Sequence, residues 1–263
     1  MEWLPIIILF IFGLPIGSFL NVVIWRLPRG ESIVFPPSHC PKCDAPIKFY
    51  DNIPVLSYII LGGRCRSCRA PISIQYPVVE FVTASLFAAS WILTGGTISW
   101  QLGAALIFTV IGIAVTGIDF HHRIIPDELS VGGLAIGLIL APLCAHAWSG
   151  LLWAFIAAIF GAVLLYLVRV GGKALFKKEA LGFGDVKLIA MIGAFVGWKG
   201  VLLTIFLAAL LGSIGGGIAM AASKKTREER LIPFGPFLMV AGLITFYFGG
   251  PLIEWYVTTF YAG

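Results

Sequence analysis

Charged residues are scarce in this chain, and their scarcity decides its class. Only 12% of the 263 residues are Asp, Glu, Lys or Arg, whereas 59% are hydrophobic. Soluble domains are roughly 25% charged and 45–50% apolar, so a soluble fold is excluded. The sequence also lacks a basic stripe interleaved with aromatic residues, which excludes a nucleic-acid partner. Low-complexity segments are absent too, and no internal repeat is evident.

Long apolar runs are abundant, and many approach the roughly 20 residues that a helix needs to cross a bilayer. The first run is expected to remain as a helix, because no small-residue cleavage site of a signal peptide follows it and Trp3 and Trp25 bracket it. The sequence therefore predicts an all-α polytopic membrane protein with about eight transmembrane helices. The expected spans are about 3–25, 76–94, 102–118, 129–147, 150–170, 181–197, 200–222 and 232–256.

Lysine and arginine are distributed unevenly between alternate loops. Seventeen of the eighteen lie in segments 26–75, 119–128, 168–187 and 223–231, which leaves Lys199 alone elsewhere. Because cytoplasmic loops retain positive charge, these four segments are predicted to face the cytoplasm and both termini the opposite side. The net charge of +5 is then explained by this orientation and by contact with anionic membrane lipid.

Four of the five cysteines gather in the polar insert 26–75, as two C-x-x-C pairs. Two such turns complete a closed tetrahedral site of the structural type, and an insert of this size needs some staple. Two disulfides or a redox-active pair are the alternatives, which a reducing cytosol disfavours. Cys144, in an apolar run, is interpreted as a buried small hydrophobe. A structural zinc ion is predicted, with the ligands Cys40, Cys43, Cys65 and Cys68.

Two of the 13 acidic residues directly abut apolar spans. Asp119 follows the run 102–118, and Asp185 ends the motif Gly182-Phe183-Gly184-Asp185. A carboxylate at a membrane border is costly and indicates a function. Facing each other, one such group activates a water as base while its protonated partner polarises a scissile carbonyl. Helix capping, or pairing with Lys187 and Arg123, is the structural alternative.

Other polar residues at the borders have simpler interpretations. Asp127 is expected to be the N-cap of the helix that follows Pro126. His121 and His122 are expected to be solvated interface residues, because no third metal ligand is suitably spaced. Glu80 is another border acid, and the sequence names no partner for it.

Combined in order, these motifs resemble those of one family. The stretch Gly117-Ile118-Asp119 to Asp127, followed by Gly182-Phe183-Gly184-Asp185-Val186-Lys187-Leu188, is similar to the paired aspartate motifs of the type IV prepilin leader peptidases. These are membrane aspartic proteases with a G-x-G-D signature, which would be a weak signal alone. Further similar segments extend over essentially the whole chain: 17–22 with Arg26-Leu27-Pro28, the cysteine module with Asn52-Ile53-Pro54, 76–80, and Phe234-Gly235-Pro236-Phe237.

The resemblance implies a bifunctional enzyme of the bacterial cytoplasmic membrane. Family members remove the basic leader from prepilins or pseudopilins, typically after a glycine, and then methylate the new N-terminal amine with S-adenosylmethionine. It implies peptidase chemistry for Asp119 and Asp185, and it associates the cysteine module with methyl transfer. The chain departs from the family at 49–52, which lacks a tryptophan, and at Gln75, where a basic residue is more common. No strand-linked glycine fingerprint is present, so no residue is assigned to the methyl donor.

The expected organisation has three parts. Residues 1–25 form the first transmembrane helix, residues 26–75 the cytoplasmic zinc module, and residues 76–263 the remaining helices with the peptidase core. Two other classes of function are alternatives. One is a transporter whose border carboxylates relay protons or bind cations, although acids deep in the spans are scarce. The other is a non-enzymatic scaffold that docks partners on the zinc module.

Overall fold

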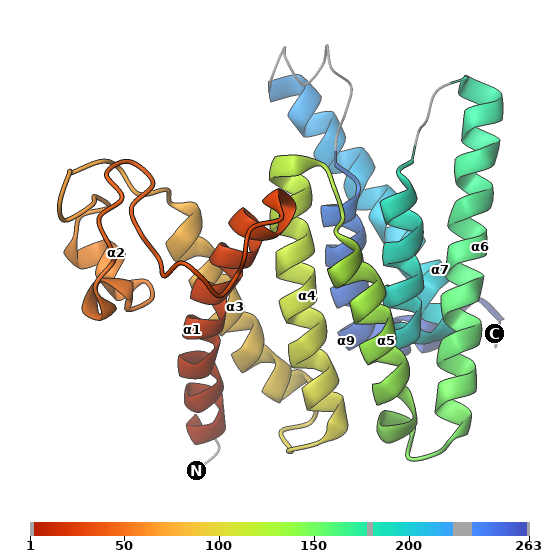
Figure 1. Cartoon of the computed structure of the whole chain (residues 1–263). Coiled ribbons are helices and arrows are strands. Elements are labelled where there is room, and N and C mark those ends of the chain that lie inside the picture. Colours follow the sequence, from red (N-terminus) through yellow and green to blue (C-terminus); the bar gives the residue numbers. More distant parts are fainter. Residues whose placement is uncertain (1–2, 178–180, 223–232, 262–263) are drawn as a thin grey trace. The chain divides into compact units, whose positions relative to one another are not determined.

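The structure is a computed structural model that describes residues 3–177, 181–222 and 233–261 (Figure 1). Its described elements are helices, and the only β-type pairings among these residues are two isolated bridges. The chain divides into two compact units, Met1–Ile98 and Ser99–Gly263.

In the first unit, α1 (Trp3–Arg26) packs along α3 (Gln75–Leu93). Two glycines of α1 allow the close approach. A Cβ on Gly13 would lie 2.6 Å from Cα of Ala84, and a Cβ on Gly17 would lie 2.6 Å from Cα of Glu80. Small residues at such positions bring helix backbones close together, which strengthens van der Waals packing in lipid. The two ends of the polar insert are thereby held side by side.

The insert itself is irregular, as the sequence predicts. It contains the 3₁₀ turns η1 (Leu27–Arg29) and η2 (Phe49–Asn52) and the short helix α2 (Leu56–Ile60). Isolated β-bridges join His39 to Pro46 and Arg64 to Pro71.

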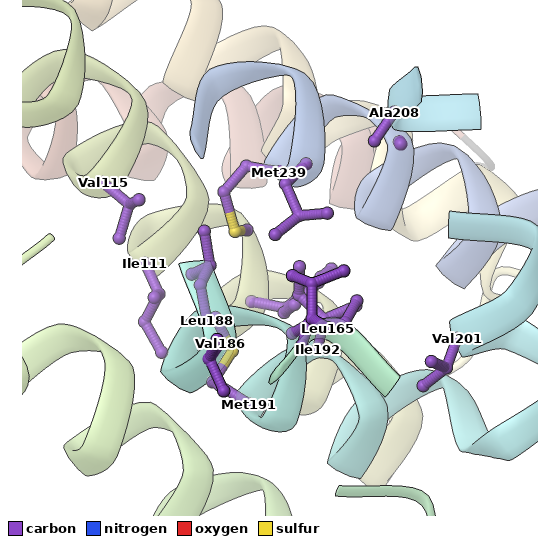
Figure 2. Close-up of a cluster of buried hydrophobic side chains, with 14 residues drawn as sticks. Ile111, Val115, Leu165, Val186, Leu188, Met191, Ile192, Val201, Ala208 and Met239 are labelled. Carbon is purple, nitrogen blue, oxygen red and sulfur yellow. The ribbon is translucent and has the colours of Figure 1, made fainter. Parts of the chain in front are cut away.

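The second unit is a helical bundle built around one long element, α7. Its helices are α4 (Trp100–His122), α5 (Asp127–Ala145), α6 (Ser149–Phe176), α7 (Phe183–Ala222) and α9 (Gly235–Tyr261), and α5, α6 and α9 all pack on α7 (Figure 1). The core is apolar and fully buried where these helices meet. Figure 2 shows Ile111 and Val115 of α4 and Met239 of α9 near Leu188, Met191 and Ile192 of α7.

A break inside α7 explains the number of spans. Gly197 has φ 74° and ψ 172°, so the element consists of two helices that meet at this residue. When α7 is counted as one helix, the described part of the chain has seven helices that are long and apolar enough to cross a membrane. The two spans expected at 181–197 and 200–222 therefore correspond to the two parts of α7.

Large apolar side chains cover the outside of these helices. Phe206 is 65% exposed and Leu167 is 60% exposed, a pattern that lipid rather than water satisfies. Helix length, composition and this outward apolar surface together confirm the expectation of an all-α, multi-pass membrane protein.

Candidate active site and cysteine module

Asp119 lies in the last turn of α4, where the helix is ended by a left-handed residue. Arg123 has φ 56° and donates its backbone N–H to the carbonyl of Asp119 at 2.9 Å. The Asp119 side chain turns inward, since the residue is only 5% exposed. Its Oδ2 accepts the backbone N–H of Gly235 at 3.0 Å, a hydrogen bond that joins the end of α4 to the start of α9.

Asp185 lies in the first turn of α7 and is 7% exposed. Its Oδ2 accepts the backbone N–H of Gly182 at 3.0 Å. An acid in the third helical position that reaches back to the chain before the helix satisfies one of the free N–H groups at a helix N-terminus. The glycine-rich motif thus bends back on its own aspartate.

The two aspartate motifs meet across the side chain of Ile125. A Cβ on Gly184 would lie 3.1 Å from Cβ of Ile125, and a Cβ on Gly235 would lie 3.3 Å from Cδ1 of the same residue. Asp185 follows Gly184 directly, and Asp119 is bonded to Gly235. The carboxyl groups of Asp119 and Asp185 interact electrostatically. The structure therefore brings together the two acids that the sequence singles out.

Lys187, which was the alternative partner for Asp185, pairs with another acid. Nζ of Lys187 lies 2.6 Å from Oδ1 of Asp127, 60 residues away in the chain. The prediction that Asp127 is an N-cap is wrong. Pro126, with extended ψ 142°, occupies the cap position and Asp127 is the first helical residue, where its carboxylate forms the ion pair instead. Arg123 exerts an electrostatic attraction on Asp119.

The two histidines at the end of α4 form no metal site with other described residues, whose one candidate metal cluster is the group of four cysteines. The ring of His121 packs edge-to-face on that of Phe120, with centroids 5.5 Å apart. His121 is exposed, in agreement with its interpretation as a solvated residue.

The four cysteines of the insert have the geometry of a tetrahedral metal site. All four Sγ atoms lie within 4.8 Å of one another, and those of Cys40 and Cys68 are 3.8 Å apart. A zinc ion with Zn–S bonds of about 2.3 Å requires sulfurs about 3.8 Å apart at the corners of a tetrahedron. The four thiolates therefore fit a zinc ion. They would fill all four of its coordination positions, so none would be open to a substrate.

The cysteine module contains an internal repeat that the sequence analysis missed. The pattern Cys-x-x-Cys-x-Ala-Pro-Ile begins at Cys40 and again at Cys65. Both copies fold alike. The first cysteine donates its N–H to the alanine carbonyl, at 3.0 Å for Cys40 to Ala45 and 2.8 Å for Cys65 to Ala70. Asp44 and Arg69, at the same place in each copy, have positive φ angles of 53° and 60°.

An ion pair connects the second C-x-x-C turn, Cys65 to Cys68, to the rest of the insert. Arg66 donates to both carboxylate oxygens of Asp51, with the shortest distance 2.6 Å, and this hydrogen-bonded guanidinium lowers the pKa of Asp51. In the same C-x-x-C turn, the backbone N–H groups of Cys68 and Ser67 lower the pKa of the Cys65 thiol to about 7. Such donors favour the thiolate, the form that binds metal.

The partners of Glu80 become visible only in the folded unit. Glu80 is 7% exposed, and its Oε2 accepts the backbone N–H of Val55 at 2.7 Å. The Ser18 side chain donates to the same carboxylate. Asn21, three residues after Ser18 in α1, is 4% exposed, and the sequence alone gives it no role. Nothing in the local sequence predicts these contacts, because their partners lie in α1, α3 and the insert.

Comparisons with known proteins agree with these features. A family model described as the bacterial peptidase A24 N-terminal domain matches residues 11–94, and one described as the type IV leader peptidase family matches residues 106–217. No solved structure matches the chain.

Curated relatives of this chain bear the name prepilin leader peptidase/N-methyltransferase. The one from Aeromonas hydrophila is 37% identical over 99% of this chain and 96% of its own length. Those from Pseudomonas aeruginosa and Legionella pneumophila are each 37% identical, over 94% and 97% of this chain and 91% and 95% of their own lengths. The resemblance drawn from the motifs is confirmed, and the chain belongs to the type IV leader peptidase family.

Proposed function

We propose that this chain is a membrane aspartic endopeptidase that removes the basic leader from prepilins or pseudopilins and then methylates the new N-terminal amine. Cleavage is assigned to Asp119 and Asp185. The observation that carries this assignment is their convergence, from α4 and α7, into one buried pair. The names of the relatives support the substrate and the second activity.

The geometry around each carboxylate suits a shared water molecule. Both backbone hydrogen bonds reach Oδ2, from Gly235 to Asp119 and from Gly182 to Asp185, and they hold the two carboxylates in fixed orientations. Two adjacent buried carboxyl groups hold one proton between them, because both cannot ionise at low cost. The ionised group removes a proton from water while the protonated group donates to the scissile carbonyl oxygen.

Fixed backbone donors favour these separate roles of base and proton donor for the two carboxyl groups. Neither N–H group moves with a flexible side chain, so the two carboxylates keep their orientation as protons move. Lys187 is engaged by Asp127, which leaves Asp185 without this cation as a direct partner. A carboxyl group without a permanent ion pair can change its protonation state during the reaction.

The orientation of the chain follows from its basic residues. We assign both aspartates and the cysteine module to the cytoplasmic side and both termini to the other side, because seventeen of eighteen Lys and Arg residues lie in the corresponding segments. A substrate with a positive leader and an apolar helix would present its cleavage junction at this cytoplasmic face.

We assign the second activity to the first unit, residues 1–98. Zinc bound by the four cysteines serves as a structural staple, since a four-thiolate site offers no open position for catalysis. S-adenosylmethionine, when bound, supplies a methyl group from a sulfonium. The buried oxygens of Asn21 and Glu80 in this unit fit a cationic reactant. A transporter and a non-enzymatic scaffold are not favoured, because neither explains the family match.

The test is direct. Purified protein is incubated with a full-length prepilin, with and without S-adenosylmethionine, and the products are weighed by mass spectrometry. We expect loss of the leader in both reactions and an added methyl group only with the methyl donor. An uncut prepilin would overturn the peptidase assignment, and an unmethylated product would overturn the second activity.

A further inference from the structure

A group of buried polar side chains lies between α1 and α3, where the apolar interface of the first unit meets the insert. Asn21 and Glu80 are 4% and 7% exposed, whereas the same interface farther along is closed by small residues such as Gly13 and Ala84. Burial of an amide and a carboxylate opposes folding unless their hydrogen bonds are satisfied. Their retention here requires an explanation.

One atom of this group is not satisfied. Nδ2 of Asn21 donates to the carbonyls of Gly17 at 3.3 Å and Tyr76 at 3.1 Å, and these two acceptors fix the orientation of the amide. Its Oδ1 is buried and accepts no hydrogen bond. Buried acceptors without a donor are rare, and each calls for an explanation, such as strain, a bound water, an ion or a catalytic role. The atom is suited to a ligand that carries N–H groups.

The neighbouring carboxylate supplies charge. Glu80 lies one turn from Tyr76 along α3 and accepts hydrogen bonds from Val55 and Ser18. Both donors, a backbone N–H and a hydroxyl, are neutral. A carboxylate held by neutral donors at a membrane border favours a cation.

We propose that Asn21 and Glu80 bind the α-ammonium group of the cleaved substrate and prepare it for methylation. This inference rests on the methyltransferase activity proposed above and names residues for it. An ammonium group offers three N–H donors and a positive charge, which match the free Oδ1 of Asn21 and the carboxylate of Glu80.

The proposed reaction balances in two steps. The ammonium first gives one proton to the Glu80 carboxylate, which frees the nitrogen lone pair. That pair then forms a bond to the methyl carbon of the sulfonium donor while the sulfur–methyl bond breaks and its electrons return to sulfur. The products are a secondary N-methylammonium and a neutral thioether.

A purely structural role for Glu80, as an anchor of α2 through Val55, makes a different prediction. The variant Glu80→Gln keeps an oxygen that accepts the Val55 N–H but removes the negative charge. If Glu80 were only an anchor, this variant would cleave and methylate normally. If it binds the amine, the variant cleaves normally and fails to methylate.

Asn21→Leu provides the second variant, because it replaces the unsatisfied amide with an apolar side chain of similar size. We expect methylation to fall while cleavage persists, although leucine also removes the Nδ2 hydrogen bond to Tyr76 and can lower the melting temperature. A merely structural asparagine would instead affect cleavage and methylation to the same extent. Ser90→Ala is the matched control, because Ser90 is a buried polar residue of α3 whose hydroxyl donates to Leu86 at 2.7 Å.

The experiment has two readouts. The first is the mass of the prepilin product, in which both variants should release a cleaved, unmethylated chain and Ser90→Ala a methylated one. The second is binding of a mature N-terminal pilin peptide, with a free or an acetylated amine, in the absence of methyl donor. The wild type should prefer the free amine by about tenfold or more, as a charge-assisted hydrogen bond entails. Glu80→Gln should show no preference.

The outcomes are separable. Normal methylation by Glu80→Gln, or equal binding of the two peptides by the wild type, would overturn the proposal. Joint loss of cleavage and methylation with a lower melting temperature would also overturn it, in favour of a structural role. If the wild type itself methylates nothing, the proposed second activity is wrong, and the amine site then stands or falls on the peptide comparison alone.

Discussion

The backbone N–H of Gly235 lies 3.0 Å from Oδ2 of Asp119, across 116 residues of sequence. A residue without a side chain therefore holds one of the two proposed catalytic acids. The contact leaves no room for anything larger, because a Cβ on Gly235 would lie 2.6 Å from the same oxygen. The start of α9 is thus part of the candidate active site although it carries no titratable group there.

Gly235→Ala should therefore impair cleavage. The added methyl group must displace the Asp119 carboxylate, and a misplacement of about 1 Å can lower a catalytic rate by about 10²-fold. The measurement is the rate of leader removal from a prepilin in detergent. Gly132→Ala is the control, because a Cβ on that glycine meets no atom within 4 Å. Equal rates for the two variants would contradict the role given to Gly235.

Asp119→Asn and Asp185→Asn should each abolish cleavage. One acid cannot act as both base and proton donor, so a loss of at least about 10³-fold is expected from either change. Thermal unfolding should show that both variants remain assembled. Asp127→Asn is the matched control, since this acid lies in the adjacent turn but pairs with Lys187, and it should retain cleavage. Persistent cleavage by either of the first two variants would reject the assignment.

Cys65→Ser should remove the metal from the cysteine module. Metal analysis of the wild type should find about one zinc per chain, and the variant should retain little. We expect methylation to fall more than cleavage, because the module belongs to the first unit. Cys144→Ser is the control, as Cys144 lies outside the cluster and should leave the zinc content unchanged. Equal loss of both activities in Cys65→Ser would make the module a general stabiliser.

Gly197→Ala should destabilise the second unit. The backbone at Gly197 lies in a region of φ and ψ that is essentially restricted to glycine, and forcing another residue into it costs about 1–3 kcal/mol. A Cβ there meets no atom within 4 Å, so the effect is one of backbone conformation alone. The melting temperature in detergent should fall, whereas Gly250→Ala, in the helical backbone of α9 and equally uncrowded, should leave it unchanged. An unaltered melting temperature for Gly197→Ala would contradict this reasoning.

The sequence predicts the helices well because each apolar run is a local property of the chain. It also finds Asp119, Asp185 and the four cysteines, since charged or metal-binding residues at the edge of apolar runs are conspicuous. It includes Gly235 and Ile125 only as members of motifs and gives them no role, because they act through a backbone N–H and through packing with residues distant in sequence. Nor could it place Asp127, whose position in the helix is set by Pro126 and whose partner, Lys187, lies in the distant helix α7.

Two further differences have physical causes of the same kind. The two spans expected at 181–197 and 200–222 are the two parts of α7, but they meet directly at Gly197 without a loop between them. The partners of Glu80 come from α1 and the insert, and no local pattern predicts a contact between segments that meet only after folding.

The close packing of α1 on α3 has a consequence for how this protein can vary. Those helices already hold residues 26 and 75 together, so a longer or shorter insert adds only the small, logarithmic cost of closing a loop of different length. The length of the cysteine-bearing insert can thus change without disturbing the packing of α1 on α3. Natural variants that enlarge, trim or lose it should still assemble the remaining helices, which makes this the region of the chain most open to evolutionary change.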